Sequence, residues 1–245
     1  MILHIPHSST KIIDGIKISN LKENINILTD WYVDELFYHL GAEILKFDYS
    51  RIVCDVERFR ENEEMDKYGM GIIYEKDMFG NDIISNLKTN DFRLSLYNKH
   101  HKKLTNIVNR YLSYFHKVLI VDCHSFSKEN IMDKKHDLPD ICLGVDKIHT
   151  PISIVRDLKY FFENEGFKVC INYPFSGTIF PEYFKNNIDV ASIMIEVNKN
   201  VYLDDKLHKN VYFSKMANII TNSLDYIWEY ENKYIKKNRI HNRNV

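Results

Sequence analysis

Short apolar segments rich in β-branched residues recur along this 245-residue chain, and stretches with helical periodicity separate several of them. The apolar segments read MILHI, AEILKF, RIVCDV, VLIVDC, DICLGV, FKVCIN and ASIMIEV. This alternation predicts an α/β fold in which a mixed, mainly parallel sheet is flanked by helices. Continuous apolar runs such as VLIVD are typical of strands that are covered on both faces.

The stretches between these segments predict three helices. Residues 90–115 place apolar and aromatic side chains three or four positions apart, as a buried helix face requires. Residues 153–166 follow a Thr-Pro start and end at a glycine, which are helix start and stop signals. Residues 212–237 predict a final helix, and we expect the basic, Asn-rich tail from about residue 236 to be frayed.

Length, charge and cysteine content narrow the class of protein. We expect residues 1–245 to form a single domain with a sizeable core. The formal net charge of −1 gives no reason to expect a nucleic acid or an anionic membrane as partner. No segment reaches the roughly 18 apolar residues of a membrane span, and the first residues do not resemble a signal peptide. The four cysteines form no C-x-x-C pair, so we expect reduced thiols and a cytoplasmic protein.

Polar side chains gather where several predicted strands end: His7 after the first, Asp55, Glu57 and Arg58 at the third, Asp122 and His124 at the fourth, Glu196 and Asn198 at the last. Because ligand sites in open α/β sheets form outside the carboxyl ends of strands, these residues are candidates for one site. A catalytic zinc takes three ligands of these types and keeps one position open for water. The pattern therefore predicts a metal hydrolase, but composition and spacing do not select the ligands.

The other polar groups are suited to definite chemical roles in such a site. A bound metal lowers the pKa of water and polarises a carbonyl, and a free carboxylate such as Glu196 can accept the proton of that water. An arginine can stabilise a developing oxyanion or hold a substrate carboxylate through two hydrogen bonds.

The motifs themselves are similar to those of one family. The segments HIPHSS, LTDWYVDELF, YSRIVCDVER, DCHSF, LPDICLG, PFSGTIFP and IMIEVNKNVYLD occur in the order found in N-formylglutamate amidohydrolases, over roughly residues 2–205. The resemblance implies a zinc-dependent amide hydrolase with a fold related to the zinc carboxypeptidases and aspartoacylases. The namesake of the family releases formate from N-formylglutamate.

The resemblance also implies roles for individual residues. The metal ligands are His7, His124 and, less directly, Asp30, because Thr10 stands where the carboxypeptidases place a glutamate. The general base is Glu196, the carbonyl oxygen is steadied by Arg51, and the substrate carboxylate is bound by Arg58. The expected pocket residues are His101, Ser176 and Gly177. The expected supports of the ligand imidazoles are Asp122, which shares a strand face with His124, and Asp55.

Some residues have a competing interpretation. The Asp30 carboxylate is also a candidate N-cap of a helix that starts in TDWYVDEL. Gly177 reads first as a turn glycine. His4 lies three residues before His7 and is interpreted as structural. The histidines at positions 39, 100, 116 and 149 are expected on the solvent side or on a helix face.

Two features depart from the family pattern. The chain has Glu57 where the family often has an asparagine, and its segment NYPFSGTIFP lacks the family's arginine. We therefore predict an amide hydrolase for a small N-acyl amino acid, with N-formylglutamate as the first candidate and one zinc per chain. The alternatives are a zinc peptidase or amidase for peptide or cell-wall substrates, and a non-catalytic protein that binds a small acid in the same fold.

Overall fold

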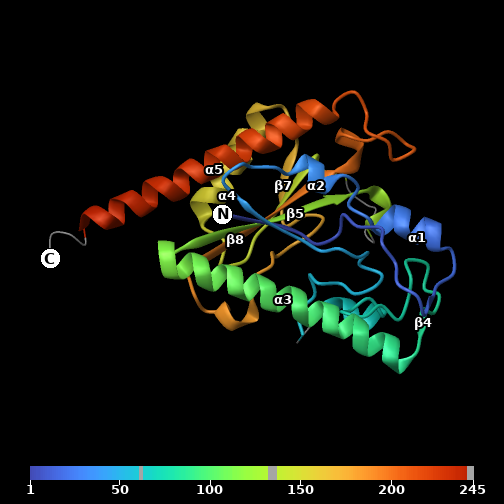
Figure 1. The fold of residues 1–245 in the computed structure, drawn as a ribbon. Coiled ribbons are helices and arrows are strands. Elements are labelled where there is room, and N and C mark those ends of the chain that lie inside the picture. Colours follow the sequence, from blue (N-terminus) through green and yellow to red (C-terminus); the bar gives the residue numbers. More distant parts are fainter. Residues whose placement is uncertain (61–62, 132–136, 242–245) are drawn as a thin grey trace.

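The computed structural model describes residues 1–60, 63–131 and 137–241, with the side chains of the last helix described as far as residue 228. A six-stranded sheet forms the centre of the molecule (Figure 1), and its strand order is β3-β1-β5-β8-β6-β7. The strands are β1 (Ile2–Ile5), β3 (Glu43–Lys46), β5 (Val118–Phe126), β6 (Ile141–Gly144), β7 (Val169–Ile171) and β8 (Val190–Asn198).

The sheet is mixed and mainly parallel. Strands β3, β1, β5 and β8 pair in parallel, whereas β6 pairs antiparallel with β8 and parallel with β7. The carboxyl ends of β1, β5 and β8 therefore lie at one edge of the sheet. This confirms the predicted fold class and places three of the polar strand ends together.

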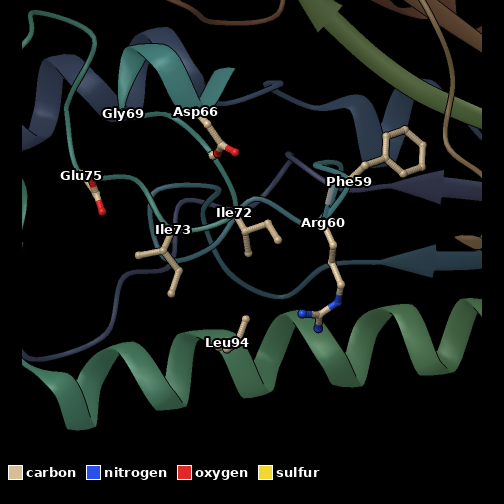
Figure 2. Close-up of a pocket in the computed structure, with 9 residues that line it drawn as sticks. Phe59, Arg60, Asp66, Gly69, Ile72, Ile73, Glu75 and Leu94 are labelled. Carbon is tan, nitrogen blue, oxygen red and sulfur yellow. The ribbon is translucent and has the colours of Figure 1, made fainter. Parts of the chain in front are cut away.

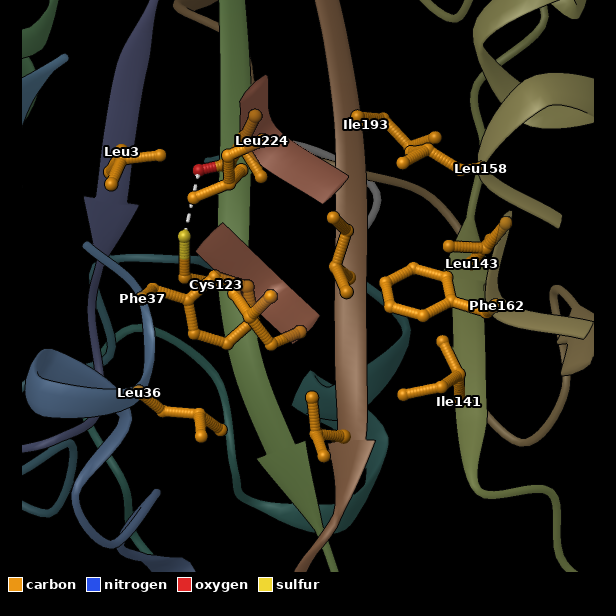
Figure 3. Packing of buried hydrophobic residues seen from close by; sticks show 14 of the residues in the cluster. Leu3, Leu36, Phe37, Cys123, Ile141, Leu143, Leu158, Phe162, Ile193 and Leu224 are labelled. Carbon is orange, nitrogen blue, oxygen red and sulfur yellow. Dashed lines mark hydrogen bonds between the residues drawn. The ribbon is translucent and has the colours of Figure 1, made fainter. Parts of the chain in front are cut away.

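Helices cover both faces of the sheet (Figure 1). Helix α3 (Leu87–Phe115) lies on one face, and helices α4 (Ile152–Asn164) and α5 (Phe213–His241) lie on the other. Leu104 and Ile107 of α3 share a core cluster with Ile2 of β1 and Ile120 of β5. The larger cluster lies beneath α4 and α5, where Leu158, Phe162 and Leu224 face side chains of β1, β5, β6 and β8 (Figure 3).

The remaining elements are short. They are α1 (Leu21–Leu28), α2 (Val33–Leu36), the antiparallel pair β2 (Ile16–Lys17) and β4 (Ile84–Ser85), and the 3₁₀ helices η1 (Glu64–Tyr68), η2 (Lys128–Asn130), η3 (Glu182–Phe184) and η4 (Lys199–Val201). Most of them lie in the long connections that begin where β1, β3 and β5 end. These connections supply residues to the carboxyl edge of the sheet.

Most predicted elements are found, with one clear exception. Each predicted strand except RIVCDV is a strand, and the three predicted helices are α3, α4 and α5. Helix α5 continues to His241, and residues 242–245 lie outside the described residues. The segment RIVCDV is a buried run of turns, so its prediction as a strand is wrong.

Helix α3 explains why this segment is buried without being a strand. The guanidinium of Arg93, which has no exposed surface, donates to the carbonyls of Ile52 and Val53. One turn later, the Tyr97 hydroxyl donates to the carbonyl of Arg58. These side chains satisfy backbone groups that a sheet neighbour would otherwise bind, so the segment folds against a helix.

Two further expectations concern membranes and thiols. Within the described ranges, no helix combines the length and the apolarity needed to cross a bilayer. All four cysteines are free, and three of them are buried: Cys54, Cys123 and Cys142. The prediction that Cys54, Cys123 and Cys142 are buried is confirmed, whereas the redox state of the thiols and the cellular compartment stay predictions.

The role of Arg93 can be tested by replacing it with leucine. Removing its donors leaves buried carbonyls unsatisfied, at a cost of about 1–3 kcal/mol for each such group. We expect Arg93→Leu to lower the free energy of unfolding by about 3 kcal/mol in total. Urea titration followed by circular dichroism measures this change. Arg110→Leu, on the exposed side of the same helix, is the control and should change stability little. Equal effects of the two substitutions would contradict the assignment.

Candidate metal centre

Two histidines and an aspartate converge at the carboxyl edge of the sheet. His7 follows β1, Asp30 follows α1, and His124 lies near the end of β5. Their candidate ligand atoms all lie within 4.8 Å of one another. Asp30 Oδ2 is 3.0 Å from His124 Nδ1 and 3.7 Å from His7 Nδ1. The three side chains are almost fully buried, with exposed fractions of 1%, 4% and 2%.

A carboxylate approaches the second nitrogen of each histidine. Asp55 Oδ1 lies 2.8 Å from His7 Nε2, and Asp122 Oδ1 lies 3.1 Å from His124 Nε2. Metal-binding histidines commonly have a carboxylate at the ring nitrogen that does not bind the metal, because this carboxylate fixes the ring orientation and the tautomer. In this arrangement both Nδ1 atoms face the Asp30 carboxylate, as the ligands of one cation would.

Two other groupings could also hold a cation. They combine His7 with Asp55 and Glu57, and His124 with Glu57 and Asp122. The grouping with Asp30 is favoured because it uses one nitrogen of each histidine and leaves Asp55 and Asp122 at the other nitrogen. The Glu57 carboxylate lies between the two rings, 3.2 Å from His124 Nε2 and 3.7 Å from His7 Nδ1. It could therefore approach the same cation as an additional oxygen ligand.

Unsatisfied polar atoms are concentrated at this place. His7 Nδ1, His124 Nε2, Glu196 Oε2, Ser8 Oγ and Thr29 Oγ1 are buried and make no hydrogen bond with the described residues. Buried polar atoms normally have a partner, and a cluster of exceptions indicates an ion, water or ligand site. The donor set of two imidazoles and a carboxylate fits a divalent transition metal.

The site also concentrates negative charge. Burial raises the pKa of Asp30, but the hydrogen bonds and charges of His124 and His7 outweigh burial and lower that pKa well below its usual value. The pKa of His124 is lowered by burial and raised more strongly by Glu57 and Asp122, so that it lies well above the usual value. A buried imidazole surrounded by three carboxylates is an environment that a cation would neutralise.

Glu196 lies beside this group on the neighbouring strand. It is the register partner of His124 across β5 and β8, so the two side chains lie on the same face of the sheet. Burial, together with the charges of Asp30 and Glu57, raises the pKa of Glu196 to about 8 despite the nearby His124. A carboxylate with a raised pKa and an unpartnered oxygen is a candidate for proton transfer.

Asp55 connects His7 with the two predicted arginines. Its Oδ2 atom lies 2.7 Å from Arg51 Nη2, 3.2 Å from Arg58 Nε and 2.8 Å from the Tyr74 hydroxyl. Its Oδ1 atom accepts from His7. The charges of Arg51, Arg58 and His7 overcome the effect of burial and hold the pKa of Asp55 well below its usual value.

Other predicted site residues lie outside this cluster. His101 bonds through Nε2 to the carbonyl of Val56 and packs on Tyr97, so it supports the segment that carries the arginines. Ser176 is exposed, and Gly177 has a φ of +86°, as a turn glycine requires. Asp30 is not an N-cap, because Tyr32 occupies that position of α2 while the Asp30 carboxylate binds His124. The N-cap interpretation is therefore wrong.

The sequence patterns do not predict several buried polar residues. The expectation that His39 and His149 lie on the solvent side or on a helix face is wrong, since both are buried outside the helices, whereas His100 lies on α3 as expected but on its buried face. His4 is fully buried and bonds to Asp122 and His100. Lys199 is also buried, donates to the carbonyl of Ile27, and has a pKa lowered by burial. Burial of such residues depends on tertiary contacts and has no local sequence signal.

A cavity of about 320 Å³ lies beyond the arginine segment and is lined by Phe59, Arg60, Asp66, Gly69, Gly71, Ile72, Ile73, Glu75 and Leu94 (Figure 2). None of these lining residues belongs to the histidine and carboxylate cluster. The cavity carries no group of metal-ligand type with an unpartnered buried atom. We therefore place the candidate centre at the cluster and not in this cavity.

Comparisons with known proteins identify a family and a similar fold. The family described as N-formylglutamate amidohydrolase matches residues 1–203. The crystal structure of an N-formylglutamate amidohydrolase from Ralstonia eutropha is similar, with a TM-score of 0.83, 20% identity, and coverage of 95% of this chain and 94% of that chain. A gene product of Agrobacterium tumefaciens is similar with a TM-score of 0.64 and 17% identity, covering 92% and 90% of the two chains. Curated proteins give no match. The structural likenesses support the fold.

The central role of Asp55 predicts a large effect of a small substitution. Asp55→Asn keeps the shape but removes the charge that faces two buried guanidinium groups. We expect the free energy of unfolding to fall by about 3 kcal/mol, because breaking a buried ion pair leaves charge uncompensated. Chemical denaturation measures the change, with the exposed Asp82→Asn as control. A loss no greater than that of the control would contradict this role.

Proposed function

Because the chain belongs to the N-formylglutamate amidohydrolase family, a family of enzymes that act on amide bonds, we propose that it is a zinc-dependent hydrolase of a small N-acyl amino acid. The observation that carries the proposal is the buried cluster of His7, Asp30 and His124 beside the unpartnered Glu196 oxygen. N-formylglutamate is the first candidate substrate. Its hydrolysis consumes one water and yields formate and glutamate.

His7, Asp30 and His124 are the proposed ligands of the zinc ion. When bound there, zinc lowers the pKa of the attacking water, polarises the amide carbonyl and offsets the negative charge of Asp30 and Glu57. Asp55 Oδ1 accepts a hydrogen bond from Nε2 of His7, and Asp122 Oδ1 lies 3.1 Å from Nε2 of His124; both carboxylates are proposed to orient the ligand imidazoles. These supports reduce the ligand motion that would loosen the site.

Glu196 is the proposed proton carrier. Its Oε2 atom accepts the proton of the attacking water, and the same carboxyl group then donates that proton to the amine nitrogen as the C–N bond breaks. Its position beside His124 supports this role. The arginines are proposed to bind the substrate, with Arg51 near the carbonyl oxygen and Arg58 near the carboxylate.

The burial of the centre favours a small substrate over a peptide or a cell-wall polymer. The three proposed ligands and Glu196 have exposed fractions of at most 6%, and the arginine side chains are exposed by 15% and 17%. We expect a site enclosed to this degree to admit an N-acyl amino acid more readily than a polymer. His101, Ser176 and Gly177 stay proposed as more distant pocket residues.

Metal content provides the first test. We expect about one zinc per chain in the protein purified without chelator, and none in His124→Ala, measured by mass spectrometry. Zinc at about 100 times its dissociation constant should stabilise the wild type by about 2.7 kcal/mol in thermal unfolding and should not stabilise the variant. A wild-type protein that takes up no zinc would reject the proposal.

Glu196→Gln separates chemistry from metal binding. The amide cannot accept the proton of water, so we expect kcat for formate release from N-formylglutamate to fall by at least about 100-fold. Zinc content should stay at the wild-type level. The exposed Glu165→Gln is the control and should leave kcat unchanged. If Glu196→Gln keeps wild-type kcat, Glu196 is not the base.

A further inference from the structure

A buried chain of polar contacts leads from helix α3 to the proposed metal ligand His124. His100 of α3 and His4 of β1 bond through their Nε2 atoms at 2.8 Å. His4 Nδ1 lies 2.7 Å from Asp122 Oδ1, and the same oxygen lies 3.1 Å from His124 Nε2. Four side chains from two strands and a helix are thus connected in series.

The sheet register creates this chain. His4 and Asp122 are paired across the parallel strands β1 and β5, so their side chains lie on the same face of the sheet. This is the face that α3 covers. His4 and Asp122 have no exposed surface, and His100 is exposed by 6% and packs edge-on against Phe47 at a centroid distance of 5.4 Å. Water therefore contributes little to holding these groups.

The Asp122 carboxylate is restrained on both oxygens. Oδ1 accepts from His4, and Oδ2 accepts from the backbone N–H of Ile179 at 3.2 Å. Because an ionised carboxylate only accepts hydrogen bonds, His4 must donate through Nδ1. The other nitrogen of His4 then needs a partner of its own, and His100 provides it.

Burying this series of polar side chains costs free energy that apolar packing would not. Buried imidazoles must be hydrogen-bonded, and apolar side chains of similar volume would fill the same space without that requirement. His149, which is buried elsewhere, illustrates a histidine that bonds only to backbone carbonyls, those of Val190 and Lys185. His4 and His100 differ because their contacts lead to a proposed ligand.

We propose that His4 and His100 are positioning residues of the metal centre, which hold Asp122 against Nε2 of His124 so that Nδ1 faces the cation. This inference rests on the proposed metal function. Neither histidine touches a proposed ligand, so each acts through Asp122. The chain makes α3 part of the support of the metal centre.

Substitution of His100 is the sharpest test, because His100 is three contacts away from His124 and cannot touch the cation itself. His100→Leu removes the partner of His4, whereas His100→Gln keeps a polar group able to bond to it. The dissociation constant for zinc is measured by chelator competition, and ligand geometry by the visible spectrum of the Co²⁺-substituted protein. We expect about tenfold weaker zinc binding and an altered spectrum for His100→Leu, and near wild-type values for His100→Gln.

His149→Leu and His149→Gln are the matched controls. They also replace a buried histidine and will alter stability, but they should leave zinc affinity and the Co²⁺ spectrum unchanged. Affinity therefore separates positioning from a general loss of stability. Equal zinc affinity in His100→Leu and wild type would overturn the inference, and so would an equal loss in the His149 variants.

A double-mutant comparison tests the order of the chain. His4→Asn keeps a short polar side chain near Asp122 but loses the bond to His100, so it should weaken zinc binding about as much as His100→Leu. The double variant should bind zinc no more weakly than either single variant, because the two substitutions break the same contact between His4 and His100. Losses of zinc affinity that add up in the double variant would contradict the proposed series of contacts. If the wild type binds no zinc, the proposed function fails as well; if it binds zinc normally and the variants match it, only the positioning role fails.

Discussion

The rest of the site depends on the contacts of the Asp55 carboxylate. It joins His7, two arginines and Tyr74, and it has no exposed surface. The segment that carries it is a run of turns whose carbonyls are bound by side chains of α3. Without these helix side chains the segment would have buried, unsatisfied backbone groups, and Asp55 would not be held between the histidine and the arginines.

The two faces of strand β5 carry different kinds of side chains. Val121 and Cys123 point into the apolar cluster beneath α4 and α5, while Asp122 and His124 point to the face covered by α3. Strand β8 alternates in the same way and places Glu196 next to His124. The apolar face supplies the burial that stabilises the sheet, and this allows the other face to hold costly polar groups close together.

The sequence predicts those parts of the site that lie at the ends of regular strands. His7, His124 and Glu196 each follow or end an apolar run, and parallel pairing brings them together. RIVCDV has the same apolar pattern but is not a strand, because its hydrogen-bond partners include Arg93, about forty residues later. Asp30 enters the prediction only through the family resemblance, and the contacts of His4 and His100 depend on a packing that no local pattern specifies.

The strand order also has a kinetic consequence. Strand β1 lies between β3 and β5, so its pairing with β5 and the contact between His4 and Asp122 join residues 118 positions apart. Contacts of such separation require the closure of long loops and form slowly during folding. The proposed ligands are spread over the same stretch of chain, so no short segment could gather them early. We expect a cation to enter a sheet that has already assembled, and the refolding rate of this protein to be insensitive to zinc.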